Sequence, residues 1–496
     1  MNVRHAPTVQ LRAARGDMKR IGLFYLISIA LCGGGILWVL NAGRQFESNS
    51  AARSILSATP GARVAAEPAA SNGGWEAGMA GPFRENLRSP LSVLLIQIVV
   101  IVLTARFFGE LARRMGQPSV IGEMIAGIVL GPSVAGALFP EFSRFVFPAL
   151  SMGNLKILSQ IGVVLFMFVV GMEMDVRQLR NKPQTALVVS HAGIVLPFFL
   201  GVALSLALYR EMASGQTRFL PFALFIGIAM SITAFPVLAR IIEERRMTKT
   251  FLGVTALTCA AINDVTAWTI LAFVVAVAQA GSLAAFGATV VLVMIFVLAM
   301  IFAVRPVLAR FPARWTEPGD ANGGVMAGAL VLVFLCAVFT EVIGIHALFG
   351  AFLAGVVMPD QAAFRSHLRE RLEGFSTIFL LPVFFAFTGL RTQIGLLDGW
   401  GAWGLSLMVI ALATLGKLGG SMLAARWTGM NWGEAFSLGA LMNTRGLVEL
   451  IVLNVGYDMG ILSPAIFAMM VLMALVTTCL TGPLLTWGQS HSSPAR

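Results

Sequence analysis

Long runs of apolar residues, separated by short polar segments, recur along almost the whole chain. A run of roughly 20 apolar residues is long enough to cross a bilayer as one α-helix, and most charged residues lie between the runs. The pattern therefore predicts an all-α polytopic membrane protein. Its fourteen expected spans cover residues 20–42, 90–109, 118–138, 154–173, 185–209, 219–242, 251–279, 282–304, 325–343, 344–358, 374–390, 400–425, 433–455 and 461–487.

The Lys and Arg residues orient these spans. Short cytoplasmic loops carry an excess of basic residues, and most of the 35 basic side chains fall on the cytoplasmic side if both termini are placed there. We expect a cell (inner) membrane protein. Its predicted parts are a cytoplasmic N-terminus with an anchor or signal segment over 1–43, an extracytoplasmic linker over 44–89, a transmembrane domain over 90–487 and a short cytoplasmic tail over 488–496. Whether the first apolar run is a retained anchor or a cleaved signal peptide stays open, although its length favours the anchor.

Composition supports a membrane protein and argues against two other classes. Apolar residues make up 57% of the chain and charged residues 12%, which leaves too little polar surface for a water-soluble globule. The net charge of +11 could suggest nucleic-acid binding, but the basic residues sit in short clusters between apolar runs, as topology requires. The sequence has no HExxH or GxSxG motif and no CxxC pair, so we expect neither an enzyme nor a bound cofactor.

An internal repeat marks two regions far apart in the chain. The segment Gly122–Val129 recurs as Gly350–Val357, and Phe166–Gly171 resembles Phe384–Gly389. Small residues four apart are also common in ordinary helix contacts, so packing alone could explain the likeness. However, the copies are seven predicted crossings apart, so the second must run in the opposite direction. Such an inverted repeat places its substrate near the bilayer midplane, where broken helices meet.

The same offset pairs the span 219–242 with the span 433–455, and both carry helix-breaking chemistry. In the first span Pro236 lacks the N–H that would bond the carbonyl of Ile232, so this carbonyl and the Thr233 hydroxyl are free to face a cation. Ser231 lies beside them. The second span holds four further polar residues, of which Arg445 and Glu449 can pair across one helical turn: Asn443, Thr444, Arg445 and Glu449. Thr-Pro kinks are common in membrane helices, so a purely structural bend is the alternative.

Asp264, preceded by Asn263, lies in the middle of a long apolar helix. An aspartate there costs roughly 2.5–3.5 kcal/mol on insertion scales, which points to a function. Burial disfavours the charged carboxylate, whereas a nearby Lys417 would favour it. A carboxyl balanced in this way could exchange protons for a monovalent cation, with Asp264 as the ligand of that transported metal ion. A structural ion pair with Lys417 is the alternative. Glu123 and Glu341 also lie at span depth, where each could line an ion path or satisfy a helix contact.

Several of these motifs resemble the monovalent cation:proton antiporter-2 family, and especially its plant-type cation/proton exchanger branch. The matching stretches, which extend from about residue 90 almost to the end of the chain, are Gln117–Gly127 (QPSVIGEMIAG), Ser231–Arg240 (SITAFPVLAR), Ala261–Asp264 (AIND), Gly344–Gly355 (GIHALFGAFLAG) and Met442–Leu450 (MNTRGLVEL).

The resemblance implies a 13-helix core, preceded here by the N-terminal hydrophobic segment, with two broken, crossing helices. It also implies a homodimer and an elevator-like movement. By position Asp264 resembles the family's cation and proton carrier, Asn263 its neighbour, Thr233 an ion ligand and Lys417 the buried lysine. Electrogenic relatives carry two adjacent aspartates, so Asn263 favours electroneutral exchange. The plant branch also has a large soluble C-terminal region, whereas only a short polar tail follows Leu485.

The predicted function is therefore secondary antiport of Na⁺ or K⁺ against H⁺. The alternative is a gated cation pathway that conducts without obligatory proton coupling, and the two differ in whether cation movement dissipates a pH gradient. A non-transporting sensor is a third, weaker possibility. Selectivity between Na⁺ and K⁺ depends on cavity dimensions that the sequence does not reveal.

Overall fold

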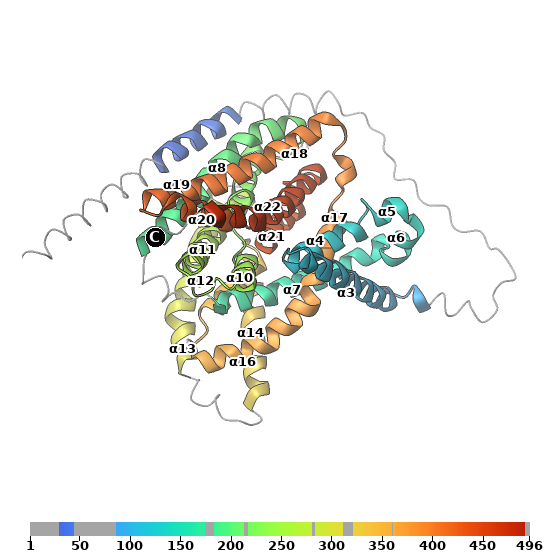
Figure 1. Cartoon of the computed structure of the whole chain (residues 1–496). Coiled ribbons are helices and arrows are strands. Elements are labelled where there is room, and N and C mark those ends of the chain that lie inside the picture. The colour runs from blue at the N-terminus through green and yellow to red at the C-terminus, as the bar shows by residue number, and fades with distance from the viewer. Residues whose placement is uncertain are drawn as a thin grey trace, which may run out of the picture.

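The computed structural model describes residues 29–43, 86–173, 183–212, 217–279, 283–310, 321–359 and 361–491. The predicted linker lies outside these ranges except for its last residues, as do residues 1–28 and the end of the predicted tail. All regular structure in the described ranges is helical (Figure 1).

The N-terminal half of the described chain contains a helix over Ile29–Gly43 and ten further α-helices. These are α3 (Pro90–Arg114), α4 (Ser119–Leu130), α5 (Ala135–Leu138), α6 (Pro140–Val146), α7 (Met152–Glu173), α8 (Pro183–Met212), α9 (Phe219–Ala229), α10 (Phe235–Glu244), α11 (Phe251–Gln279) and α12 (Leu283–Ala299).

The C-terminal half continues in the same helical pattern, and three π-helical turns connect adjoining helices. The helices are α13 (Arg305–Ala309), α14 (Ala321–Val342), α15 (Ala347–Val356), α16 (Ala362–Phe375), α17 (Leu381–Arg391), α18 (Gly399–Thr414), α19 (Gly420–Trp427), α20 (Trp432–Met442), α21 (Leu447–Asp458) and α22 (Pro464–His491). The π-turns are η3 (Met300–Val304), η5 (Ser376–Leu380) and η7 (Leu415–Gly419).

Within the described residues, nine helices are long and apolar enough to cross a membrane, or ten if the bent pair α20 and α21 forms one span. This confirms an all-α polytopic membrane protein. Other predicted spans fall on shorter apolar helices: Ile29–Gly43, Phe219–Ala229, Met326–Val342 and Ala347–Val356. The total of fourteen spans stays a prediction, because these helices are too short to be assigned as crossings by length alone.

The repeated glycine motifs lie at two matching helix contacts. A Cβ added at Gly127 of α4 would lie 2.4 Å from the carbonyl oxygen of Phe385 in α17, and one added at Gly355 of α15 would lie 2.2 Å from that of Phe168 in α7. Only a residue without a side chain permits such close backbone approach. Each copy of the first motif therefore packs against the helix that contains the second motif of the other copy.

Two helices are interrupted in mid-chain, as the sequence predicted, and the first interruption is a complete break rather than the alternative of a bend. α9 ends at Ala229 and α10 begins only at Phe235. Pro236 lies in the first turn of α10, where a helix needs no backbone N–H from that residue. Pro236 therefore starts α10 rather than bending a continuous helix. That the carbonyl of Ile232 is free to face a cation stays a prediction. α20 and α21 are separated by Asn443–Gly446 and are bent by 43°.

The helix Ile29–Gly43 packs on α8 and α9 rather than standing apart. Its Val39 is buried with Val202, Phe219 and Ala223. A Cβ at Gly43 would overlap the Phe219 ring, at 1.8 Å from the nearest ring carbon, so the small residue is required for this contact.

Candidate functional site

The two polar residues of α11 that the sequence singled out are fully buried. The side-chain oxygen Oδ1 of Asn263 accepts a hydrogen bond of 3.0 Å from the backbone N–H of Thr233, in the break between α9 and α10. Asp264 is 0% exposed, and neither carboxylate oxygen has a hydrogen-bond partner among the described residues. Burial disfavours a charge on a carboxyl that has no such partner.

The two helix breaks contact each other directly. The backbone N–H of Ala234 donates to the carbonyl oxygen of Thr444 at 3.0 Å, and the Thr233 hydroxyl donates to the carbonyl oxygen of Met442 at 3.0 Å. These bonds satisfy backbone groups that no helical turn can satisfy, since interior polar groups need partners where water is excluded. They fix one break against the other beside α11.

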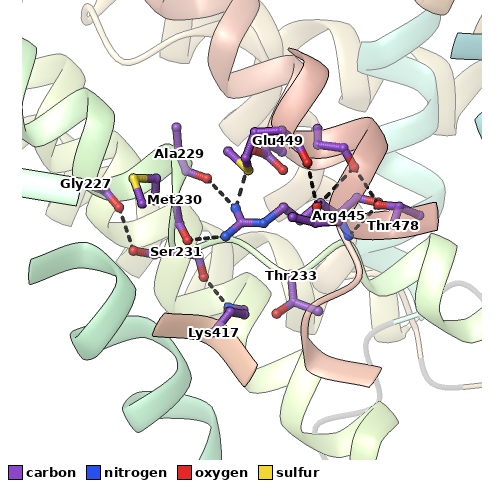
Figure 2. A network of polar contacts seen from close by, with 12 residues as sticks. Gly227, Ala229, Met230, Ser231, Thr233, Lys417, Arg445, Glu449 and Thr478 are labelled. Carbon is purple, nitrogen blue, oxygen red and sulfur yellow. Dashed lines mark hydrogen bonds and ion pairs between the residues drawn. The ribbon is translucent and has the colours of Figure 1, made fainter. Parts of the chain in front are cut away.

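Two buried cationic side chains cover the carboxyl end of α9 (Figure 2). Arg445 donates from Nη1 to the carbonyl of Ala229 at 2.9 Å and from Nη2 to the carbonyl of Met230 at 2.6 Å. Lys417, in the π-turn η7, donates from Nζ to the carbonyl of Ser231. The last carbonyls of a helix lack partners within it and carry its negative dipole end, so positive groups stabilise this position.

The hydroxyl of Ser231 makes a separate bond. It donates to the carbonyl of Gly227 at 2.6 Å, so the hydroxyl points back along α9, while the carbonyl of the same residue meets Lys417. The sequence-based alternative of a direct ion pair between Lys417 and Asp264 is not present, because the ammonium bonds this carbonyl instead.

The predicted pair of Arg445 and Glu449 is present at 3.4 Å, between two fully buried side chains. Glu449 lies in the first turn of α21, where the positive end of the helix dipole favours a carboxylate. One guanidinium therefore links the carboxyl end of α9 to the amino end of α21 (Figure 2).

Sequence reasoning missed the contribution of α22. The Thr478 hydroxyl accepts from the backbone N–H of Arg445 at 3.0 Å and lies 2.9 Å from the carbonyl oxygen of Arg445. The hydroxyls of Thr481 and Thr444 lie 3.5 Å apart. Three threonines on one face of an apolar helix, at 477, 478 and 481, were the available signal.

Several polar atoms at this junction have no partner among the described residues. They are both carboxylate oxygens of Asp264, Nδ2 of Asn263, both side-chain polar atoms of Asn443, Nε of Arg445 and Oε2 of Glu449. Native interiors leave few polar groups unpaired, and such groups call for a ligand or a functional reason. Carboxylate, amide and carbonyl oxygens together form the hard donor set that suits an alkali cation.

A cavity of about 330 Å³ leads toward the breaks from one end of the molecule. Its walls include Pro236 of α10, Leu447 of α21 and Glu123 of α4. Glu123 therefore lines a cavity, whereas Glu341 caps a helix, since its Oε2 accepts from the backbone N–H of Ala347 at 2.7 Å.

Comparison with known proteins gives consistent results. Residues 74–487 match the family described as sodium/hydrogen exchanger, transmembrane. The chain is 42% identical over 397 residues to the Na(+)/H(+) antiporter NhaS4 of Synechocystis sp., covering 79% of this chain and 96% of that protein. It is 42% identical to Cation/H(+) antiporter 17 of Arabidopsis thaliana over 80% of this chain and 48% of that protein, so it spans about half the length of this relative.

The fold has a solved counterpart. The sodium proton antiporter MjNhaP1 from Methanocaldococcus jannaschii superposes with a TM-score of 0.56 at 14% identity, over 81% of this chain and 97% of that one. At this identity the likeness shows the fold. The sequence matches independently confirm the family that the motifs indicated.

Proposed function

This chain belongs to the sodium/hydrogen exchanger family, and we propose that it is a secondary active antiporter in which H⁺ and Na⁺ or K⁺ compete for Asp264. The relatives named as Na⁺/H⁺ and K⁺/H⁺ antiporters support this assignment. No chemical transformation of a substrate is involved, so the protein is a transporter rather than an enzyme.

The observation that carries the proposal is the state of the Asp264 carboxyl. It is 0% exposed and has no hydrogen-bond partner among the described residues. An isolated buried carboxylate is strongly disfavoured, so the group binds a proton or a cation. Because two cations cannot occupy one small oxygen site together, loading one releases the other, which is the chemical requirement for antiport.

The neighbouring groups have distinct proposed roles. Thr233 supplies ligand oxygens, and Asn263 holds the first break against α11. Ser231, predicted as a ligand, has its hydroxyl bonded to Gly227 and its carbonyl to Lys417, so it supports the break instead. Lys417 and Arg445 neutralise the carboxyl end of α9, so the bound cation does not have to do so. Two of the remaining supporting residues lie in the first turns of α10 and α21, namely Pro236 and Glu449. The other two, Asn443 and Thr444, lie in the second break.

The exchange requires that the site faces one side of the membrane at a time, and the inverted repeat provides a basis for this. The matching glycine contacts of α4 with α17 and of α15 with α7 support an inverted repeat within a 13-helix core. Positive residues near the 330 Å³ cavity, such as Arg240 and Arg369, support a cytoplasmic opening. We assign the protein to the cell (inner) membrane as a homodimer, with both termini in the cytoplasm if the first apolar segment is retained.

The proposal is tested with everted vesicles that carry an imposed pH gradient, reported by a fluorescent amine. Adding Na⁺ or K⁺ should dissipate the gradient in wild-type vesicles. Asp264→Asn should abolish the signal, whereas Asp398→Asn, the same chemical change at an exposed loop position, should leave it intact. Full exchange by Asp264→Asn would overturn the assignment, and cation flux that leaves the pH gradient unchanged would favour an uncoupled channel.

A further inference from the structure

Two cavities of very different size lie along three helices, α7, α17 and α21, toward their opposite ends. The cavity of about 330 Å³ lies among the C-terminal part of α7 (Phe166 to Glu173), the first residues of α17 and α21, and residues of α4 and α10. A pocket of only about 30 Å³ lies among the middle of α7 (Ser159 to Val163), the C-terminal parts of α17 and α21, and the start of α15. The space between α21 and the helices α7 and α17 is therefore open at the end near the larger cavity and closed at the other end.

A cluster of charged and polar side chains closes the second end. Arg391, the last residue of α17, donates to Asn454 Oδ1 at 2.8 Å and to the carboxylate of Asp458, the last residue of α21. Lys156 of α7 pairs with the second oxygen of the same carboxylate at 3.2 Å. We call these four residues, Lys156, Arg391, Asn454 and Asp458, the clasp.

Further contacts hold the clasp in place. The Arg391 guanidinium lies between two rings, 4.8 Å from the centre of Phe387 in α17 and 4.6 Å from that of Tyr457 in α21. Asn454 Nδ2 donates to the hydroxyl of Thr388 in α17 at 2.8 Å. The contact of Arg391 with Phe387 lies within α17. The other contacts of Arg391 and Asn454 given above join α17 to α21.

The partial burial of the clasp gives it energetic weight. The side chains of Arg391 and Asp458 are 15% and 22% exposed, so water screens their attraction less than that of a surface pair. The side chain of Lys156 is 37% exposed and contributes less. All of these contacts would separate if α21 moved away from α7 and α17.

We propose that the clasp is the closed gate on the side opposite the cavity, and that Asp458 and Arg391 set which face of the membrane the ion site opens to. This inference rests on the proposed antiport, because only a transporter of that kind must open the two ends in turn. It adds a pair of positioning residues far along α21 from the break that holds Arg445. Opening the gate exposes Asp458 at the mouth of the pathway, where a carboxylate attracts cations.

The test measures accessibility rather than transport. In a chain whose four native cysteines are replaced, Val163→Cys reports on the small pocket and Val169→Cys on the large cavity. A membrane-impermeant maleimide is applied to right-side-out and everted vesicles. Adding Asp458→Asn should raise the labelling rate at position 163 about tenfold relative to that at position 169, which corresponds to about 1.4 kcal/mol.

Controls separate the clasp from general damage. Glu110→Gln removes the carboxylate that pairs with Arg113 and Arg114 within α3, and should leave both rates unchanged. Asp458→Glu keeps a carboxylate and should retain the parent pattern, while Arg391→Gln breaks the clasp from α17 and should reproduce the shift. An unchanged rate ratio in Asp458→Asn and Arg391→Gln would overturn the proposal.

The same vesicles distinguish the two proposals. Lack of cation-dependent exchange in the wild-type protein would overturn the antiport, whatever the labelling pattern. Unchanged labelling in clasp variants that still exchange cations for protons would overturn only the proposed role of the clasp as a gate.

Discussion

Replacing Arg445 by methionine should destabilise the protein severely, for a reason that can be worked out from its contacts. The change leaves Glu449 as a buried carboxylate without its counter-charge and removes the donors to the carbonyls of Ala229 and Met230. Removing one partner of a buried ion pair costs about 3–5 kcal/mol. Each buried carbonyl left without a donor adds about 1–3 kcal/mol. With the lowest value for the ion pair and for both carbonyls, the free energy of unfolding should fall by at least about 5 kcal/mol.

The double variant Arg445→Met/Glu449→Gln identifies the origin of this cost. The amide removes the lone buried charge but restores no donor to α9, so we expect recovery of about 1–3 kcal/mol relative to the single variant. The assay follows the folded fraction of detergent-purified protein with increasing denaturant. Arg426→Met is the matched control, because that arginine lies at an exposed position, and it should cost no more than about 0.5–1 kcal/mol. A double variant as unstable as Arg445→Met would refute the reasoning.

Three further predictions concern the ion site and the repeat. Asn263→Asp adds a second carboxylate beside Asp264 and should make exchange respond to membrane voltage, measured as a change in rate when a potassium diffusion potential is imposed. Thr233→Val removes the hydroxyl that bonds Met442 and should raise the KM for the cation about fivefold, from about 1 kcal/mol, with Thr233→Ser restoring it. Gly389→Ala would place a Cβ 2.0 Å from the backbone of Gly127 and should cost about 1–3 kcal/mol or more in unfolding measurements, whereas Gly153→Ala, with nothing within 4 Å, should be tolerated.

The elements of the site that depend on local chemistry could be predicted from the sequence. An acidic residue in mid-span identified Asp264, and runs rich in Ser, Thr, Asn and Pro identified two helix breaks. The pairing of Arg445 with Glu449 followed from their spacing of four residues. Each of these features is set by the bilayer or by helix geometry within a short segment, so the residues involved are close in the sequence.

The contacts between distant segments could not be predicted from the sequence. A direct ion pair of Lys417 with Asp264 was one alternative, and the ammonium instead bonds the carbonyl of Ser231, which is 186 positions earlier in the chain. Arg445 likewise reaches Ala229 and Met230 across more than 200 positions. Choosing among several buried acceptors depends on distances of a few tenths of an ångström, which only the packed helices determine. The clasp was missed for the same reason, because Asp458 at a helix end resembles any solvated terminal charge.

The pH dependence of the cation KM tests the central claim most directly. If H⁺ and the cation exclude each other from the Asp264 carboxyl, the KM measured in proteoliposomes should rise about tenfold for each pH unit on the acid side, while the maximal rate changes little. A KM that stays constant while the maximal rate falls would show that the proton and the cation bind different groups, and would contradict the account.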